Sequence, residues 1–381
     1  TSTASFVANG RLVTVATDTF ELQGGNFIMK ILIITPEIHR LGGVANHYLG
    51  LSPYWTEHVS YLFYGKRSDK TPTWLTILLY PYDYFRFIWS SIRGKYDVVI
   101  INPSLRKAQV IRDGLFLLLT RAFGRPAVTF IHGFDTDYAA RLAEKGKLFR
   151  WCYNKSAFIY TLYSGFRNQL QRIGITCPIV LTTTKVADEM LAGVTIPARK
   201  NIINILFVAR IVKEKGIFIT LRAYEELQPK YPQLRLTVCG DGPALADAKK
   251  YTADRKIKNV IFKGNITGNK LRDMYLDADL YILPTYQEGM ATSVLEAMAF
   301  GLPVLSRPVG GVRDFWKNKD MGFLMESLDS HDYAQQIEQL IGDSSLVEHI
   351  STFNRQYARD HFLASKVTEK FEDDIKKFLT V

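Results

Sequence analysis

The sequence of 381 residues has few cysteines and no long hydrophobic run. Its three cysteines, Cys152, Cys177 and Cys239, are far apart and odd in number, which argues against a disulfide framework or a metal spacing. Its apolar runs, such as 98–101 and 115–119, are only a few residues long, whereas a membrane-spanning helix needs roughly 20. The first residues also lack the basic start and apolar stretch of a secretory signal. We therefore expect a cytoplasmic protein without a membrane-spanning helix.

The basic charge of the chain is concentrated in its first half. The net charge is +11; residues 29–200 carry 23 basic and 11 acidic side chains, whereas residues 201–381 carry 24 of each. A one-sided basic surface favours an anionic partner, such as an acidic membrane, a phosphate-bearing substrate or nucleic acid. No nucleic-acid-binding motif is present, so we expect no nucleic-acid partner. Charge that serves solubility alone is the remaining explanation.

Short apolar segments alternate with helical patterns along the chain. Alternation of continuous apolar strands with helices indicates parallel sheets that are covered on both faces. A polar stretch over 183–201 separates two such series, which predicts an α/β protein of two doubly wound domains facing each other across a cleft. Ligands of such sheets bind outside the carboxyl ends of the strands. The expected strands are 31–35, 59–64, 98–102, 127–131, 158–162 and 179–182, then 203–209, 234–239, 260–263, 280–283 and 304–306.

These patterns predict four parts of the chain. Met29 runs directly into the first apolar strand, so we interpret residues 1–28 as an extension that comes from cloning or from a wrongly assigned start, although weak alternation over 12–15 would allow an edge hairpin. We expect a first, acceptor-side domain over 29–195 and a second, nucleotide-sugar-binding domain over 196–360. Residues 361–381 are expected to form a helix that crosses back to the first domain.

Two glutamates, Glu288 and Glu296, follow the strand expected over 280–283. Ser293-x-x-Glu296 has the form of a capping box, with Ser293 as N-cap. Glu288 would then lie in a loop and Glu296 on the first helical turn, beside free backbone N–H groups that suit a phosphate. A carboxylate at this place could accept hydrogen bonds from a ribose diol. Capping alone for Glu296, and a solvated loop charge for Glu288, explain the local pattern equally well.

Two further loops at strand ends suit a phosphate ligand. Arg210 and Lys215 follow the strand over 203–209 and precede a helix, where two cations could clamp a diphosphate. Gly240-Asp-Gly242 follows the strand that ends at Cys239, and its glycines permit a tight turn with close backbone approach. Each loop alone is also compatible with an ordinary turn.

Taken together and in order, four segments strongly resemble the retaining glycosyltransferases of family 4, also called glycosyl transferases group 1. These are GT-B enzymes, with two Rossmann-like domains and a nucleotide sugar in the cleft. The resemblance covers roughly residues 29–381 and is strongest over 203–315. The segments are Arg210…Lys215-Gly216, Gly240-Asp-Gly-Pro, Glu288-x7-Glu296-Ala-Met-Ala-x-Gly301-x-Pro303-Val and Gly310-Gly311.

The resemblance implies a role for each matching side chain. Arg210 and Lys215 would hold the diphosphate of the donor and stabilise the leaving nucleotide, Glu296 would bind the ribose hydroxyls, and Glu288 would hold hydroxyls of the transferred sugar. Cations and helix N-termini do the electrostatic work in this family, so we expect no metal and no cofactor besides a UDP or GDP sugar as co-substrate. Backbone N–H groups of one loop would complete the cradle: Gly289, Met290, Ala291 and Thr292.

Glycine loops and one histidine complete the implied site. Gly42-Gly43 follows the first strand and precedes a helix; the resemblance implies that this loop approaches the donor phosphate and the acceptor, and that Gly240 lies at the nucleotide sugar. His132 ends the strand over 127–131, and the resemblance implies that it reaches the transferred sugar. Without the resemblance, an ordinary turn explains the glycines and a polar strand cap explains His132.

The chain departs from the family pattern at two places. Met290-Ala291 stands where the family usually has Phe-Gly, which leaves the identity of the sugar open. The usual Asn-Gly turn after the last strand of the first domain is replaced by Thr-Thr-Thr-Lys-Val over 182–186, so no residue is assigned there. Two Asp-x-Asp pairs imitate the metal site of a different glycosyltransferase fold; helix capping explains Asp135 and Asp137, and a turn explains Asp277 and Asp279.

The segment over 82–95 mixes aromatic and basic residues at helical spacing. Such a helix could lie in a membrane interface, with its cations at anionic headgroups. It could also pack on the first sheet while Arg and Lys extend to solvent. We favour packing on the sheet for the aromatic residues.

These observations predict a retaining, metal-independent glycosyltransferase with His132, Glu288, Arg210 and Lys215 as its catalytic candidates. It would transfer a sugar from a nucleoside-diphosphate donor to a hydroxyl of a glycan or lipid-linked acceptor, in the assembly of bacterial envelope polysaccharide or glycolipid. We expect it in the cytoplasm, at the inner face of an anionic membrane that the basic first domain would contact. The alternative is a nucleotide-sugar epimerase or hydrolase of the same two-domain architecture.

Overall fold

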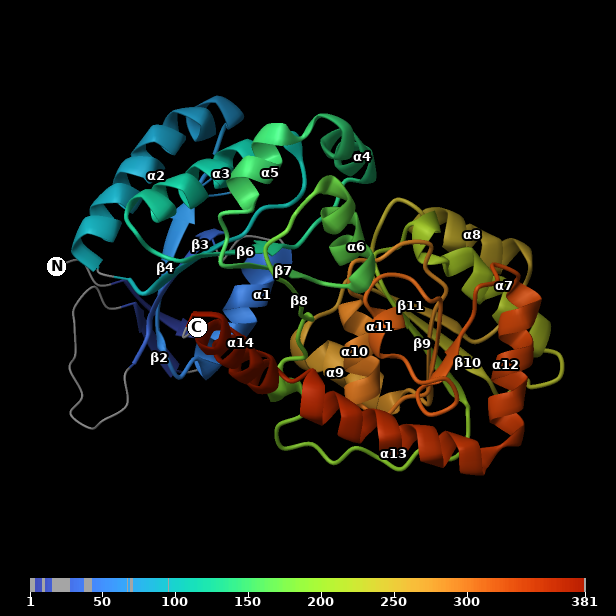
Figure 1. The fold of residues 1–381 in the computed structure, drawn as a ribbon. Helices are drawn as coiled ribbons and strands as arrows, with labels where there is room; N and C mark the ends of the chain where they lie inside the picture. Colours follow the sequence, from blue (N-terminus) through green and yellow to red (C-terminus); the bar gives the residue numbers. More distant parts are fainter. Residues whose placement is uncertain are drawn as a thin grey trace.

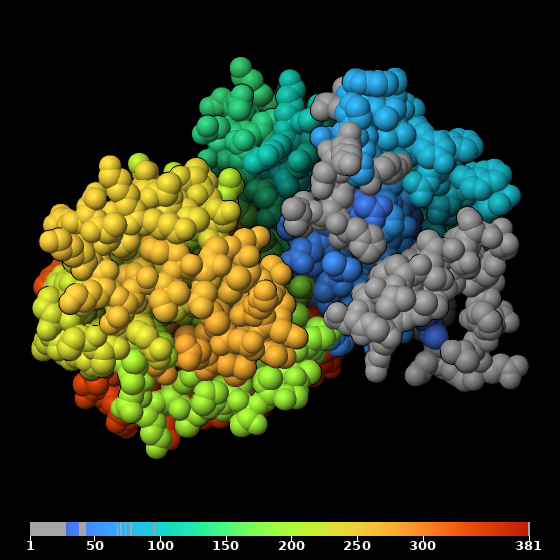
Figure 2. Space-filling model, turned by 180° about the vertical axis from the view of Figure 1, so that it is seen from behind, coloured from blue at the N-terminus to red at the C-terminus, as the bar shows by residue number. Residues whose placement is uncertain are grey.

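The computed structural model describes residues 4–8, 11–15, 28–37, 43–66, 68, 71–94 and 96–379. Two six-stranded parallel sheets form two lobes with helices packed around them (Figure 1). From behind, the lobes are separated by a furrow (Figure 2). The predicted pair of doubly wound α/β domains is therefore confirmed.

The first sheet has the strand order β4-β3-β5-β6-β7-β8. Its strands are β3 (Lys30–Pro36), β4 (His58–Tyr64), β5 (Val98–Ile101), β6 (Ala127–Ile131), β7 (Phe158–Thr161) and β8 (Ile179–Leu181). The helices around it are α1 (Gly43–Leu51), α2 (Thr73–Gly94), α3 (Lys107–Ala122), α4 (Thr136–Lys145), α5 (Lys147–Tyr153) and α6 (Ser164–Ile173).

Both faces of the first sheet are buried, because alternate residues of its strands enter two separate cores. In β3, Leu32 and Ile34 join the core beneath α2, α3 and α5, whereas Ile31 and Ile33 join the core on the opposite face, beside α1. This period of two is what a strand geometry imposes on successive side chains. A strand with apolar residues on both faces needs a helical layer on each side.

The second sheet has the strand order β11-β10-β9-β12-β13-β14. Its strands are β9 (Asn204–Val208), β10 (Arg235–Cys239), β11 (Val260–Gly264), β12 (Leu280–Leu283), β13 (Val304–Ser306) and β14 (Gly322–Leu324). Its helices are α7 (Ile217–Leu227), α8 (Leu245–Asp254), α9 (Gly268–Asp277), α10 (Thr292–Ala299), α11 (Val312–Phe315), α12 (Ser330–Gly342) and α13 (Ser344–His361). The order reverses between β9 and β12, which is the position where ligands of such sheets bind.

The last helix, α14 (Ala364–Leu379), returns to the first lobe (Figure 1). Phe371 and Ile375 lie in the same core as Ile33, and the Glu372 carboxylate accepts hydrogen bonds from the backbone N–H groups of residues 56 and 57, at 2.7 and 3.0 Å. The chain therefore crosses between the lobes twice, once after β8 and once before α14.

The two crossings touch each other. Val186 N–H donates to the Phe362 carbonyl (2.7 Å), and Ala364 N–H donates to the Val186 carbonyl (2.9 Å), so Val186 and Leu363 form a short parallel bridge. The Asp188 carboxylate adds hydrogen bonds to the start of α14.

The N-terminal residues contribute a separate hairpin. β1 (Ala4–Ala8) and β2 (Arg11–Val15) pair antiparallel with each other and with neither large sheet. Among the residues that the structure describes, no helix combines the length and the apolar character needed to cross a membrane.

The preferred packing of the aromatic residues in 82–95 is wrong for three of them. Phe87 is fully buried against the first sheet, but Tyr82, Phe85 and Trp89 are 55%, 61% and 49% exposed. The reason is that α2 is apolar around most of its circumference, while a helix can turn only one side to a sheet. The other side stays at the surface.

Candidate functional site

The loops that follow β9 and β12 meet where the order of the second sheet reverses. Gly216 has a left-handed backbone (φ 77°), and a Cβ there would clash with the carbonyl of Pro284. The Tyr286 N–H donates to the Glu214 carbonyl (2.8 Å), which ties the two loops together. A glycine is required at this contact because any side chain would push the loops apart.

Charged side chains of these two loops form a site at the carboxyl edge of the sheet. The ammonium of Lys215 forms an ion pair with the Glu288 carboxylate; both side chains are mostly buried. Arg210 is exposed, and its guanidinium makes no ion pair or hydrogen bond with any residue that the structure describes. One cation is thus held by a neighbouring acid while the other is available to an anion.

Two glycine turns support this edge by close backbone contact. Gly240 has φ 137°, and a Cβ on it would clash with the carbonyl of Ala209, directly before Arg210. Gly310 has φ 59°, and a Cβ there would approach the carbonyls of Glu288 and Gly289. Each turn therefore presses a glycine against the backbone that carries a predicted site residue.

The predicted capping box is wrong. α10 has Ala291 as its N-cap, and no side chain caps this end. Ser293 Oγ instead accepts a hydrogen bond from the Tyr281 hydroxyl, and Glu296 Oε2 accepts one from the Tyr275 hydroxyl, both at 2.7 Å. The two tyrosine hydroxyls reach α10 from the layer beneath it and donate to Ser293 Oγ and Glu296 Oε2, which are side-chain oxygens that a capping box would use.

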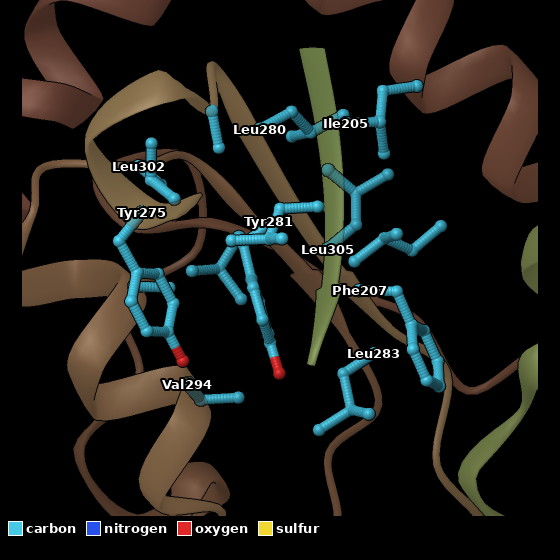
Figure 3. Close-up of a cluster of buried hydrophobic side chains, with 14 of the residues drawn as sticks. Ile205, Phe207, Tyr275, Leu280, Tyr281, Leu283, Val294, Leu302 and Leu305 are labelled. Atoms are coloured by element: carbon cyan, nitrogen blue, oxygen red, sulfur yellow. The ribbon is translucent and has the colours of Figure 1, made fainter. Parts of the chain in front are cut away.

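Figure 3 shows the rings of Tyr275 and Tyr281 side by side, with their hydroxyls at the same end of the cluster, toward Val294. Their centroids are 6.4 Å apart, and both side chains are fully buried. Tyr275 belongs to α9 and Tyr281 to β12, so two different elements orient two polar residues of α10. Burial raises the pKa of the Glu296 carboxyl, while the Tyr275 hydroxyl and the Lys185 ammonium oppose this rise.

Lys185 is a site residue that the sequence did not reveal. It lies in the stretch over 182–186, to which no role was assigned, and its ammonium interacts electrostatically with Glu296 across the two lobes. Its side chain passes over Gly50 of α1, where a Cβ would clash with it. Burial lowers the pKa of Lys185, and Glu296 counteracts this effect. The signal that could have found it was a cation at the end of the last strand of the first domain.

His132 lies at the carboxyl end of β6, beside the buried polar side chains of Asn102 and His47. Its Nε2 lies 3.0 Å from Asn102 Oδ1, while Asn102 Nδ2 donates to the Ile34 carbonyl (2.9 Å). Because the amide nitrogen is used as a donor, Oδ1 is the acceptor, and Nε2 must carry the proton. Burial, reinforced by His47, lowers the pKa of His132 well below its usual value. His132 is therefore a neutral ring whose Nδ1 can accept a hydrogen bond.

His47 connects this group to Lys185. The rings of His47 and His132 are 5.5 Å apart, and burial together with the charge of Lys185 lowers the pKa of His47 to about 3. Electrostatic coupling therefore links successive pairs of groups from the second lobe to the first: Glu296 with Lys185, Lys185 with His47, and His47 with His132.

The predicted glycine loop is only partly described. Gly42 lies outside the described residues. Gly43 begins α1 and is exposed, and a Cβ on it would meet no atom of the described residues within 4 Å.

The predicted loop over 289–292 lies at the contact between the lobes. Met290 packs against the cores of both lobes, and Gly289 faces Leu162 of the first lobe. Ala291 is buried, and Thr292 Oγ1 donates to Thr184 Oγ1 (3.2 Å). The side chain of Met290, at which the chain departs from the family pattern, therefore fills the joint between the lobes.

The Asp-x-Asp pairs have structural partners. Asp135 caps α4 by accepting from the Tyr138 N–H (2.9 Å), as predicted, and Asp279 accepts from the N–H groups of Ile203 and Asn204. Within the described part of the chain, no group of three or more His, Cys, Asp or Glu side chains is placed to hold a metal ion.

The assembled site suits an anionic ligand that also carries hydroxyl groups. The second lobe provides Arg210, Lys215, Glu288 and Glu296 around the ends of β9 and β12, and the first lobe provides His132 and the start of α1. Cations can bind a diphosphate, and carboxylates and a neutral imidazole can accept hydrogen bonds from hydroxyls.

Comparison with known proteins agrees with this chemistry. Residues 193–357 match the family described as glycosyl transferases group 1. A glycosyltransferase named for teichuronic acid biosynthesis, TuaC of Bacillus subtilis (strain 168), is 31% identical over 180 residues, which are 45% of this chain and 43% of TuaC. The capsular polysaccharide biosynthesis glycosyltransferase CapM of Staphylococcus aureus is 29% identical over 175 residues, 45% of this chain and 46% of CapM. The chain thus spans less than half the length of these relatives.

The fold of nearly the whole chain has a solved counterpart. The crystal structure of HepE from Anabaena in complex with UDP superimposes with a TM-score of 0.70 at 16% identity, covering 92% of this chain and 100% of HepE. At this identity the likeness concerns the fold alone, and it establishes the predicted GT-B architecture of two facing Rossmann-like domains.

Proposed function

Because residues 193–357 match the glycosyl transferases group 1 family, we propose that the chain transfers a sugar from a nucleoside-diphosphate sugar to a hydroxyl acceptor, with retention and without a metal ion. The observation that carries this proposal is the cluster at the end of β9 and β12, where exposed Arg210 and paired Lys215 and Glu288 lie beside the free N-terminal end of α10. Such a cluster supplies charge for a diphosphate and acceptors for a sugar.

The donor would bind with its diphosphate at Arg210 and Lys215. Lys215 is held by Glu288 in the structure, and donor binding would exchange this ion pair for contacts to phosphate oxygens. Glu288 would then be free to accept from hydroxyls of the transferred sugar, and Glu296 would accept from the ribose diol. The UDP in the HepE complex supports a nucleotide in this fold. The proposed donor nucleotide of this chain is UDP or GDP.

Transfer would proceed on one face of the sugar. The bond between the anomeric carbon and the leaving phosphate oxygen breaks, Arg210 and Lys215 stabilise the charge on the diphosphate, and the acceptor oxygen forms the new bond on the same face. The acceptor proton passes to the departing phosphate oxygen. His132, as a neutral ring, would accept a hydrogen bond from a sugar hydroxyl through Nδ1 and hold the sugar in place.

The acceptor would be a hydroxyl of a glycan or of a lipid-linked intermediate. The names of TuaC and CapM, which refer to bacterial envelope polysaccharides, support this class of acceptor. The excess of positive charge in the first domain supports an acceptor that carries phosphate or lies at an anionic membrane on its cytoplasmic side.

The test compares Arg210→Ala and Glu288→Ala with two control variants in a transfer assay with UDP and GDP sugars. Arg235→Ala is the matched control for the arginine because Arg235 is exposed at the opposite, amino end of β10, and Glu348→Ala removes an exposed carboxylate of α13. We expect a loss of at least about a hundredfold in the two site variants and none in the controls. Near-normal transfer by both site variants would remove the assigned site.

Two further measurements test retention and metal independence separately. The anomeric configuration of the product, followed by NMR, tests retention, and full activity after treatment with EDTA tests metal independence. Turnover of the donor alone to a new sugar, at a rate that no acceptor changes, would favour the epimerase or hydrolase alternative.

A further inference from the structure

Helix α2 carries a continuous stripe of large apolar side chains on its exposed side. The six residues follow one another at intervals of three or four positions, which places them within one narrow arc of a helix. At 1.5 Å per residue the stripe is about 27 Å long. The members and their exposed fractions are Trp74 65%, Leu78 64%, Tyr82 55%, Phe85 61%, Trp89 49% and Ile92 59%.

The stripe is not an unfilled part of the core, because the opposite side of α2 is fully engaged. Phe87 is buried against Phe116 of α3, with ring centroids 5.4 Å apart. The buried Asp83 carboxylate accepts a hydrogen bond from the Gly65 N–H (2.8 Å). These contacts fix the rotation of the helix and leave the stripe at the surface.

The apolar surface continues across the two neighbouring helices. α2, α3 and α5 lie side by side over the same face of the first sheet (Figure 1). α3 exposes Ile111 (63%) and Leu115 (42%), and α5 exposes Leu148 (73%) and Trp151 (55%). We call these four residues together with the stripe of α2 the outer helical face.

The outer helical face has positive charge and no exposed acid. Within α2, α3 and α5 the acidic residues are Asp83 and Asp113, and both are buried. Exposed cations stand at the edges of the apolar residues: the Arg93 guanidinium lies 4.0 Å from the ring centroid of Trp89, and the Lys155 ammonium lies 4.8 Å from that of Trp151. Further cations flank the same helices: Arg106, Lys107, Arg121 and Lys147.

We propose that the outer helical face binds the surface of a bilayer that contains anionic phospholipid, with α2 lying in the plane of the interface. Aromatic and aliphatic side chains in one row can enter the boundary between headgroups and acyl chains, while the cations beside them meet phosphate groups. A bilayer with anionic headgroups fits this charge pattern. Exposed cations lie beside the exposed Trp89 and Trp151, and the three helices expose no acidic side chain.

The decisive experiment is flotation of the full chain with vesicles of phosphatidylglycerol and phosphatidylcholine, compared with vesicles of phosphatidylcholine alone. We expect flotation with the anionic vesicles and much less with the neutral ones. The double variant Phe85→Ser with Trp89→Ser should bind the anionic vesicles at least about tenfold more weakly. Two large apolar side chains are lost, so membrane binding removes much less apolar surface from water. The matched control, Ile203→Ser with Ile261→Ser, removes two exposed apolar residues of the second lobe and should float like the wild type.

Charge is tested in the same assay. Arg93→Glu with Lys155→Glu should reduce binding to anionic vesicles, whereas Lys258→Glu with Lys263→Glu, at exposed positions of the second lobe, should not. Melting curves and circular dichroism show that each variant is folded. Flotation needs no turnover, so its result is independent of the proposed sugar transfer.

Three outcomes would overturn the proposal. The wild type remains at the bottom of the gradient with anionic vesicles; the control pair loses as much binding as the α2 pair; or the chain is a dimer in solution that Phe85→Ser with Trp89→Ser converts to a monomer without affecting flotation. The last outcome would identify the outer helical face as an interface between two copies of the chain.

Discussion

Tyr275 and Tyr281 offer a matched pair for testing how the site holds Glu296. Both tyrosines are fully buried, and the hydroxyl of each lies 2.7 Å from a side-chain oxygen of α10 and within hydrogen-bonding distance of one backbone carbonyl, but only Tyr275 donates to a carboxylate. The substitutions Tyr275→Phe and Tyr281→Phe remove the same atom from the same core. A difference between them therefore reports on Glu296 and not on packing.

The size of the expected effect follows from the type of bond. A hydrogen bond to a charged group contributes about 1.5–3 kcal/mol, and a neutral one about 1 kcal/mol. Since one pKa unit corresponds to about 1.4 kcal/mol, Tyr275→Phe should raise the pKa of Glu296 by roughly one to two units. Tyr281→Phe should leave this pKa in place.

Stability should respond with a definite sign. Burial already raises the pKa of Glu296 above its unfolded value, so the folded chain holds this proton more tightly, and stability falls as pH rises from the unfolded pKa through the folded one. Tyr275→Phe extends this loss. The variant should therefore be destabilised more at neutral pH than near pH 4, where the carboxyl is mostly protonated in both states; Tyr281→Phe should cost about the same at both.

The assay is the affinity for UDP, by calorimetry from about pH 5 to about pH 9, together with thermal melts. If ionised Glu296 accepts the ribose hydroxyls, the acid-side loss of UDP affinity should move upward by roughly one to two pH units in Tyr275→Phe alone. A role of the Tyr275 hydroxyl in keeping Glu296 ionised is refuted if the two variants shift the profile equally, or if neither shifts it while Glu296→Gln abolishes UDP binding.

Two further predictions concern residues of the first lobe. Gly50→Ala should weaken UDP binding by about tenfold, because its Cβ displaces Lys185 from its place near Glu296, whereas Gly342→Ala, where a Cβ meets open space, should not; equal UDP titrations for both would contradict this role. Burial lowers the pKa of His47 to about 3, so below about pH 6.5 the wild type should lose on the order of 1 kcal/mol of stability per pH unit through this group. His47→Asn should remove this loss and flatten the acid side of the profile of stability against pH. Equally steep profiles for both proteins in thermal melts would refute this.

Most strands were predictable because both of their faces are apolar. In β5, four consecutive Val and Ile residues are buried, and no other element satisfies such a run in a chain of alternating helices. β14 was missed because it has only three residues at a sheet edge and begins with Gly322, which gives no such signal.

The site residues on the loops after the strands were predictable from the sequence, but the buried residues that contact them were not. The ion pair of Lys215 with Glu288 joins two residues that the sequence had singled out. The partners of Glu296 were not predictable, because Tyr275 lies on another element and Lys185 on another domain, and their proximity arises only from the packing of α9 and of the crossing segment.

The exposed stripe of α2 shows the limit of helical periodicity as a signal. Hydrophobic residues around most of a helix predict burial, yet only Thr76, Asp83 and Phe87 are fully covered among the α2 side chains that the structure describes. Which side faced the sheet was decided by the fit of Phe87 to α3 and by the acceptor role of Asp83, neither of which appears in a pattern of hydropathy.

The bridge between Val186 and Leu363 determines how the two lobes can move relative to each other. Because both crossings are hydrogen-bonded to each other at one place, the lobes share a single pivot there and keep a fixed separation at it. A rotation about this pivot moves distant contacts by a longer arc than near ones. The hydrogen bonds from Ser164, at the start of α6, to Asp314 of α11 connect the lobes away from this bridge, so a rotation about the bridge that opens the lobes would have to break them.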